Sequence, residues 1–165
     1  MAYKDALIAK LKSESAQTKK MLEKVPLDKA SWKPHNKSMS VGRLATHVAE
    51  IPHWISRIVT IDDFDFLVHG FSSHVAASTE ELITIFNDKL NKAIADLELM
   101  DDESFDKIWT VRSGEQVFYK LKKKVGVRSW GLNHLIHHRG QLSVYLRLLD
   151  IPVPGMYGPS ADEKM

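Results

Sequence analysis

The sequence predicts an all-α fold, a four-helix bundle formed by one domain over residues 1–165. Four stretches place apolar residues at the 3.6-residue spacing of a helix that buries one side, at about 2–24, 40–61, 78–100 and 124–150. A long gap without a helical pattern lies between the second and third stretches, which indicates a crossover connection there. At 165 residues the chain can bury a core without disulfides or structural metals.

The first two predicted helices meet prolines. The apolar side of the first is formed by Leu7, Leu11, Thr18, Leu22 and Val25. It stops at Pro26. The second begins at Ser40, a residue type that caps helix N-termini through its hydroxyl. Pro52 lies inside this helix, and because proline lacks a backbone donor and crowds the preceding turn, we expect a kink there.

The third predicted helix has the clearest start signal in the chain. Ser78-Thr79-Glu80-Glu81 is a capping box, in which Ser78 and Glu81 can satisfy each other's backbone donors. Its apolar stripe is formed by Leu82, Phe86, Leu90, Ala93, Leu97 and Met100. Between this helix and the fourth, residues 109–119 alternate around a Ser113-Gly114 pair, which indicates a short hairpin or an extended excursion.

Composition argues against several classes of partner. Lys and Arg number 23 and Asp and Glu 21, so the formal charge of +2 creates no strong field for nucleic acid or anionic lipid. No segment approaches the roughly 20 apolar residues of a membrane span. The N-terminus also lacks the continuous apolar stretch of a signal peptide. We therefore expect a cytoplasmic protein that acts on a small molecule, with neither nucleic acid nor membrane as its partner.

Histidines cluster in the fourth predicted helix, in NHLIHHRGQ at 133–141. Because residues four apart return to nearly the same side of a helix, His134 and His138 share one side and are expected to point inward. His137 falls toward the margin of that side. The inward side also carries Trp130, Gln141, Tyr145, Leu148 and Leu149, and the opposite side carries Arg139, Ser143 and Arg147.

The second predicted helix adds another inward-facing histidine, His47. The same geometry surrounds it with Leu44, Ile51, Trp54, Ile55 and Ile58, and places Ala45, Ala49, His53 and Ser56 outside. An unpartnered buried polar group costs about 1 to 3 kcal/mol, so these imidazoles need a partner. A divalent transition metal would be one, because a His-x-x-x-His pair spans one turn at chelating distance. Periodicity alone leaves ordinary packing or surface histidines as an equal alternative.

Without cysteine, only nitrogen and oxygen atoms can hold such a metal. Three histidine ligands would leave one or more positions for water or substrate, as in catalytic zinc sites. The metal itself is not specified, because three imidazoles suit zinc, nickel and iron alike.

Two segments, SMSVGRLATHVAEIPHW at 38–54 and LNHLIHHRGQLSVYLRLLDIPVPGMYGPSADE at 132–163, resemble the DinB family of small metalloproteins. SWKPHNKSMS and STEELI extend this similarity over most of the chain. The resemblance implies an up-down-down-up four-helix bundle and a metal held by His47, His134 and His138. It implies the reaction only broadly, because related proteins include thiol-dependent S-transferases, isomerases and metal-dependent hydrolases.

We therefore expect a metal-dependent enzyme of the hydrolase or thiol S-transferase type. The alternative is a non-catalytic metal-binding protein of a stress response. A thiol would have to arrive as a low-molecular-weight cosubstrate, because the chain has no cysteine.

Glu50, Gln141 and Tyr145 are the candidates for residues that assist the chemistry. Glu50 lies one turn beyond His47 and could orient a ligand or act as a general base; a boundary carboxylate paired with a lysine or arginine is the alternative. Gln141 and Tyr145 continue the side of the paired histidines and could hydrogen-bond water or substrate at the metal. Tyr145 is equally well explained as core packing.

The remaining expectations concern packing. Trp54 and Trp130 are expected in the bundle core. The Pro- and Gly-rich segment 150–163 is expected to fold back as a lid, an oligomer contact or a structured tail. A homodimer is predicted from an outer face of the fourth helix formed by Leu132, Ile136, Gly140 and Ser143.

Overall fold

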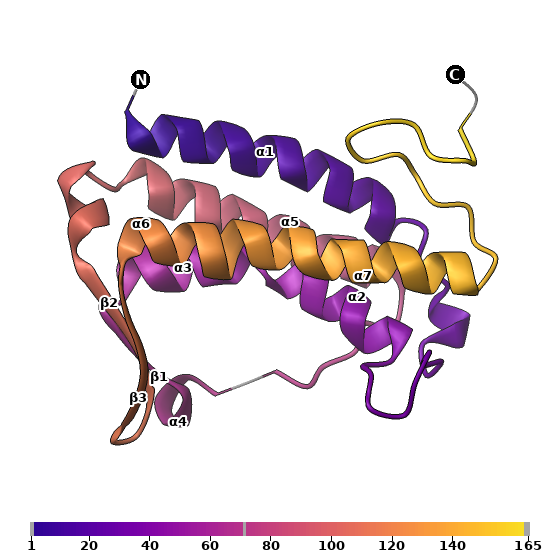
Figure 1. Cartoon of the computed structure of the whole chain (residues 1–165), viewed down its shortest axis with the longest axis horizontal. Coiled ribbons are helices and arrows are strands. Elements are labelled where there is room, and N and C mark those ends of the chain that lie inside the picture. The colour runs from indigo at the N-terminus through magenta and orange to yellow at the C-terminus, as the bar shows by residue number, and fades with distance from the viewer. Residues whose placement is uncertain (1, 71, 164–165) are drawn as a thin grey trace.

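The computed structural model describes residues 2–70 and 72–163 of the chain. Within these residues, four long helical segments pack side by side (Figure 1). They are α1 (Tyr3–Leu22), α2 (Val41–Glu50) continued by α3 (Pro52–Thr60), α5 (Thr79–Glu98), and α6 (Lys123–Gly126) continued through a π-helical stretch (Val127–Asn133) into α7 (His134–Leu148). The helices α1 and α7 run in one direction, and α2, α3 and α5 run in the other (Figure 1). Shorter elements are α4 (Phe66–His69) and 3-10 turns at Leu27–Lys29 and Glu103–Asp106.

The prediction of an all-α protein was wrong, because the chain also forms a mixed sheet. Within the described residues this sheet contains β1 (Asp63–Asp65), β2 (Ile108–Ser113) and β3 (Gln116–Lys122), in that order. The antiparallel pair β2 and β3 is the hairpin that residues 109–119 indicated, and Gly114 turns it with a φ of +57°. The strand β1 pairs in parallel with β2 from the connection between α3 and α5. A three-residue strand has no periodic pattern of its own, so only its distant partner defines it.

The predicted helix starts and the predicted kink agree with the structure, with one change in detail. The Arg43 N–H donates to Ser40 Oγ at the start of α2, over 3.3 Å. At the kink, Ile51 keeps helical angles (φ −56°, ψ −38°) and its N–H donates to the His47 carbonyl, so the chain continues into α3 beyond Pro52. At the start of α5 the Glu81 N–H donates to Ser78 Oγ, but the Glu81 carboxylate accepts from Ala77 and not from Ser78.

The core consists of two adjoining clusters of buried side chains. The first joins strand residues to helices around Trp54, Phe64, Phe105 and Trp109. The second lies around Leu44, Phe86, Leu135 and Leu142. The helices α2 and α3 contact α5, α7 and the π-helical stretch, so they are covered on most sides. Ala45, Ala49 and Ser56 are therefore buried, which corrects their predicted outward position, and His53 is half-buried.

The predicted outer side of the fourth helix also needs correction, because Arg139 is buried. Its Nη2 donates to Glu14 Oε2 over 2.7 Å and to the Tyr157 hydroxyl over 2.8 Å, and that hydroxyl donates to the same Glu14 oxygen. Glu14 occupies the place in the stripe of α1 between Leu11 and Thr18, where the apolar pattern is interrupted. The buried side of α7 thus passes through Arg139, and His134 and His138 lie beside it and are only partly buried.

The hydrogen bonds of Tyr157 fix the position of the C-terminal segment, residues 150–163. It folds back from the end of α7 toward α1 (Figure 1), and Tyr157 joins it to both helices. Leu132 is also buried, with 7% of its surface exposed, so the apolar outer face used to predict a homodimer is smaller than expected. The homodimer stays a prediction. Among the described residues, no helix has the length and apolar character needed to cross a membrane.

Candidate metal centre

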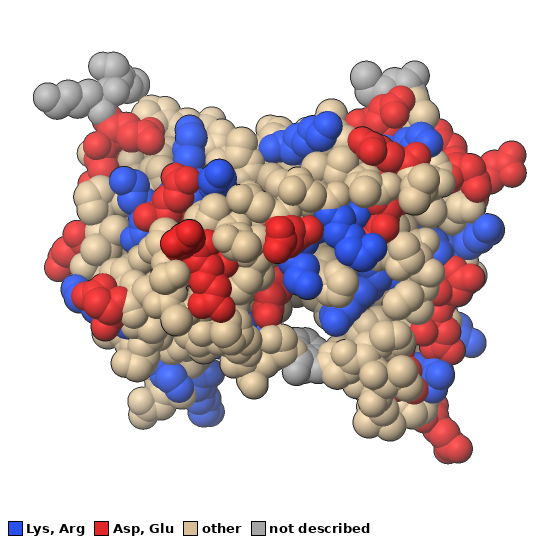
Figure 2. All heavy atoms as spheres, turned by 180° about the vertical axis from the view of Figure 1, so that it is seen from behind, with Lys and Arg blue, Asp and Glu red and all other residues tan. Residues whose placement is uncertain are grey.

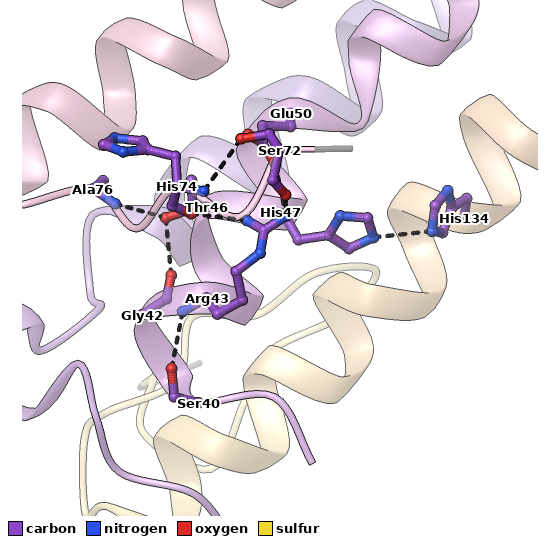
Figure 3. Close-up of polar contacts among 10 residues, drawn as sticks. All are labelled: Ser40, Gly42, Arg43, Thr46, His47, Glu50, Ser72, His74, Ala76 and His134. Carbon is purple, nitrogen blue, oxygen red and sulfur yellow. Dashed lines mark hydrogen bonds and ion pairs between the residues drawn. The ribbon is translucent and has the colours of Figure 1, made fainter. Parts of the chain in front are cut away.

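The position of His47 is set by close packing at the start of α2. The N–H groups of Val41 and Gly42 donate to the carbonyls of Trp32 and Ala30 over 2.9 and 3.0 Å. A Cβ on Gly42 would lie only 2.7 Å from the Ala30 Cβ, so glycine is what permits this approach. One and a half turns later, α2 presents His47 toward α7 (Figure 3).

The positions of His134 and His138 depend on the π-helical stretch that precedes them. A Cβ on Gly131 would lie 2.6 Å from Ile55 Cγ1, so this stretch packs directly against α3. Regular α-helix resumes at His134 and places His138 one turn further along the same side. Helical periodicity therefore fixes the pair relative to each other, and the contact with α3 fixes it relative to His47.

The structure brings His47, His134 and His138 together, with one ring nitrogen from each lying within 4.8 Å of the others. His47 Nε2 is 3.1 Å from His134 Nε2. The His138 ring centroid lies 4.6 Å from that of His47 and 4.7 Å from that of His134. Two nitrogens bound to one tetrahedral zinc at about 2.0–2.1 Å stand about 3.4 Å apart. The nitrogens therefore fit around one small cation.

Hydrogen bonds on the far side of two rings select the tautomer that a metal requires. The Nδ1 of His134 lies 3.2 Å from the Trp130 carbonyl, and the Nδ1 of His138 lies 2.7 Å from Gln141 Oε1. Because these oxygens accept, both Nδ1 atoms carry the proton. The Nε2 atoms keep their lone pairs and can act as ligands.

Burial keeps these rings neutral. It is the largest cause that lowers the pKa of His47 to about 3 and that of His134 to about 4, and it also lowers the pKa of His138. The neighbouring imidazoles add to the effect at His47 and His134, because a positive charge on one ring opposes a positive charge on the next. Neutral imidazole is the form that binds a metal, so the site is ready to bind one at neutral pH.

Arg43, one turn before His47, connects α2 to a neighbouring loop (Figure 3). Its guanidinium donates to Glu50 Oε2 over 2.9 Å and to the carbonyls of Ser72 and His74. The Ala76 N–H, further along this loop, donates to Thr46 Oγ1 on α2. Glu50 is therefore paired with an arginine, as one sequence interpretation had it, and it also lines a cavity together with His47.

The other candidate residues occupy different surroundings. Gln141 is exposed and contacts His138 through the hydrogen bond described above. Tyr145 packs its ring edge-on against Trp32, with centroids 5.7 Å apart, in the second core cluster. His137 is exposed and its ring centroid lies 4.9 Å from that of His138.

A groove of about 840 Å³ opens beside the histidines. Its apolar walls are formed by Met39, Trp54, Phe66, Val75 and Trp130, and all three histidines line it. Trp54 and Trp130 contact each other with ring centroids 5.0 Å apart. Trp54 belongs to the core, as the sequence indicated, and Trp130 is partly buried against that core. Both also form a wall of the groove, which the sequence did not indicate.

Sequence reasoning also missed Arg43, although a signal for it existed. It stands four residues before His47 and therefore on the same side of α2. Phe66 gave no such signal, because it belongs to the connection between α3 and α5 and reaches the groove only through the fold.

Comparisons with known proteins found a family model that covers almost the whole chain and several relatives. The model of the DinB family matches residues 1–164. The uncharacterized protein YjoA of Bacillus subtilis (strain 168) is 23% identical over 147 residues, which cover 89% of this chain and 91% of that protein.

Similar solved structures share the fold. The DinB-like protein YjoA of Bacillus subtilis has a TM-score of 0.70 at 19% identity and covers 97% of this chain and 99% of its own. A DinB-like protein of Bacillus cereus has a TM-score of 0.70 at 20% identity, over 93% and 97% of the two chains. YfiT of Bacillus subtilis, described as "a probable metal-dependent hydrolase with an unusual four-helix bundle topology", has a TM-score of 0.58 at 16% identity over 87% of each chain.

Proposed function

The chain belongs to the DinB family, and from this premise we propose that it is a metal-dependent hydrolase whose divalent cation is held by His47, His134 and His138. The observation that carries the proposal is the convergence of three neutral imidazoles on one point at the wall of a groove. YfiT, which shares the fold, is described as a probable metal-dependent hydrolase, and this supports the same class of reaction here.

Each residue near the centre has a role in this proposal. The cation, when bound, supplies a Lewis acid and activates water. Trp130 and Gln141 hold the rings of His134 and His138 in the ligand tautomer through their Nδ1 atoms. The aromatic walls of the groove position the apolar part of a small-molecule substrate and exclude bulk water from it.

Glu50 is the residue to which we assign the proton transfer. Arg43 holds its Oε2, and within the described residues no hydrogen bond engages its Oε1. That oxygen can accept the proton of an attacking water molecule, because Glu50 and His47 line the same cavity. This free carboxylate oxygen is the reason to prefer hydrolysis over thiol S-transfer, which would use the same three ligands.

Metal content tests the first part of the proposal. Protein purified without a histidine tag is loaded with zinc or nickel, passed over a desalting column and analysed for metal. We expect about one equivalent in the wild type and in His137→Ala, the matched control on the same helix, and a loss of at least 90% in His134→Ala. Metal-free wild-type protein after reconstitution would refute the centre.

Turnover tests the second part. The loaded protein is assayed with ester, amide and phosphoester substrates, and in parallel with a low-molecular-weight thiol plus 1-chloro-2,4-dinitrobenzene. We expect hydrolysis that disappears in His134→Ala and Glu50→Gln and persists in His137→Ala. Thiol-dependent conversion without hydrolysis would replace the assignment by an S-transferase. Metal binding without either activity would favour the non-catalytic alternative.

A further inference from the structure

A second cavity adjoins the histidines on the side of α5. It has a volume of about 230 Å³, and its polar lining is formed by His47, Glu50, His53, Arg57, Ser72 and Lys89. It shares His47, Trp54 and Ser72 with the aromatic groove, so the two cavities meet at a candidate metal ligand. Seen from behind, the molecule gathers Lys and Arg side chains near the middle of its face (Figure 2). Two of the chain's cations, Arg57 and Lys89, line this cavity beside His47.

Arg57 is a partly buried cation that stacks on aromatic rings. Its guanidinium carbon lies 4.9 Å from the ring centroid of Trp54 and 5.0 Å from that of Phe64. Stacking on aromatic rings leaves the N–H groups at the edge of the guanidinium available. Within residues 2–70 and 72–163, no hydrogen bond or ion pair engages them. The pKa of Arg57 is lowered because its charge is partly buried.

The neighbouring acids do not neutralise this charge. Glu50 attracts Arg57 but forms its ion pair with Arg43, over 2.9 Å, and Asp96 forms its ion pair with Lys92, over 3.0 Å. Lys89 forms no ion pair within the described part of the chain. Arg57 and Lys89 therefore bring two positive charges to one small cavity, and no ion pair among the described residues engages either of them.

His53 lies in the same cavity and is affected by the same positive charges. Its pKa is lowered to about 4, first by burial and then by the positive charges of Arg57, Lys89 and Lys92. Its buried Nδ1 has no hydrogen-bond partner among the described residues. A buried cation or polar atom without a partner is unfavourable unless a ligand supplies one.

We propose that the substrate is an amphipathic organic anion, whose carboxylate or phosphate group binds Arg57 and Lys89 while its apolar part lies between Trp54, Phe66 and Trp130. The edge of a guanidinium presents parallel N–H donors that match a carboxylate or a phosphate. The groove is of the size and apolar character of small-molecule sites. The inference rests on the proposed function in one respect: the reacting bond of the substrate lies beside His47, between the cavity of Arg57 and Lys89 and the aromatic groove.

Calorimetric titration of the metal-free full-length protein tests the proposal with a matched set of probes. 4-Phenylbutyrate and 4-phenylbutyl phosphate carry an anion and an aromatic group, 4-phenylbutan-1-ol carries only the aromatic group, and acetate and inorganic phosphate carry only the anion. We expect at least one anionic amphiphile to bind about 10-fold or more tightly than the alcohol and than its own short anion. Which of the two anionic amphiphiles binds more tightly distinguishes a carboxylate from a phosphate substrate.

Variants locate the binding. Arg57→Gln and Lys89→Gln should each raise the Kd of the preferred anion at least about 5-fold. Neither should change the Kd of the alcohol by more than about twofold. Lys12→Gln, which removes an exposed cation of α1, is the control and should change neither value. Thermal melting of each variant verifies that it folds.

The proposal is overturned if no probe binds, if the alcohol binds as tightly as both anions, or if the cavity variants bind the anion as the wild type does. Because these titrations use metal-free protein, their outcome is independent of metal content and turnover. An anion preference in a protein that binds no metal would refute the hydrolase and leave the anion site standing. Metal binding and hydrolysis in a protein without an anion preference would refute the anion site and leave the hydrolase standing.

Discussion

Replacing Arg139 by methionine should destabilise the protein strongly. The side chains of Arg139 and Glu14 are only 3% and 1% exposed, and the guanidinium also donates to the Glu14 carbonyl and to Thr18 Oγ1. Burial raises the pKa of Glu14, but hydrogen bonds from Lys10, Tyr157 and Arg139 outweigh it, so the pKa is lowered and the carboxylate is charged at neutral pH. Without Arg139 this charge stays buried with fewer partners.

Removal of one partner of a buried ion pair costs about 3 to 5 kcal/mol of unfolding free energy. For a chain of 165 residues this corresponds to a decrease in Tm of roughly 6 to 20 °C. Urea unfolding followed by circular dichroism measures it. Arg147→Met is the matched control, because Arg147 on the same helix pairs with Asp162 while half-exposed, and its loss should cost at most about 1 kcal/mol.

A double variant, Glu14→Leu with Arg139→Met, separates loss of the pair from loss of packing. It should be more stable than Arg139→Met alone, because it leaves no unpaired buried charge. The reasoning would be refuted if Arg139→Met lost no more free energy than Arg147→Met, or if the double variant were the less stable of the two.

The other predictions concern pH, the ligand tautomer and helix packing. Because the pKa of His53 is lowered from 6.5 to about 4, its contribution to stability should be complete above pH 6.5 and should fall as the pH drops toward 4; urea unfolding at pH 7 and pH 5 should show a larger loss in the wild type than in His53→Asn. Gln141→Leu should weaken zinc affinity about 10- to 100-fold through His138, and unchanged affinity in a competition titration would argue against this support. Gly131→Ala should destabilise by about 1 to 3 kcal/mol because its Cβ would meet α3, whereas Gly140→Ala, with open space on the same helix, should be neutral or stabilising; equal Tm values would contradict the packing argument.

Local signals were reliable where one short segment contains the whole feature. The Ser40 cap, the Pro52 kink and the turn at Gly114 each depend on a few consecutive residues, and each is present. The spacing of His134 and His138 is of the same kind, because helical periodicity places residues four apart on one side in any bundle.

Local signals failed where the partner is distant. The strand β1 pairs with β2 across more than 40 positions of the chain, and Arg139 meets Glu14 from the other end of the sequence. The π-helical stretch at 127–133 also changes the phase of the helix just before His134, and a wheel drawn at 100° per residue does not include such a change. Of the predicted outer side of the fourth helix only Arg139 is buried, because it meets Glu14 of α1, whereas Ser143 is partly buried and Arg147 is exposed.

The sequence by itself indicated which residues could bind a metal, because cysteine is absent, His134 and His138 share one side of a helix, and His47 faces inward from another. Only the tertiary structure decided that His47 meets the pair, that aromatic walls open beside them, and that Arg57 and Lys89 line a cavity next to His47 without an ion pair among the described residues. The physical reason is that periodicity sets the direction of a side chain relative to its own helix axis. The rotation and separation of neighbouring helices come from packing between residues far apart in the chain.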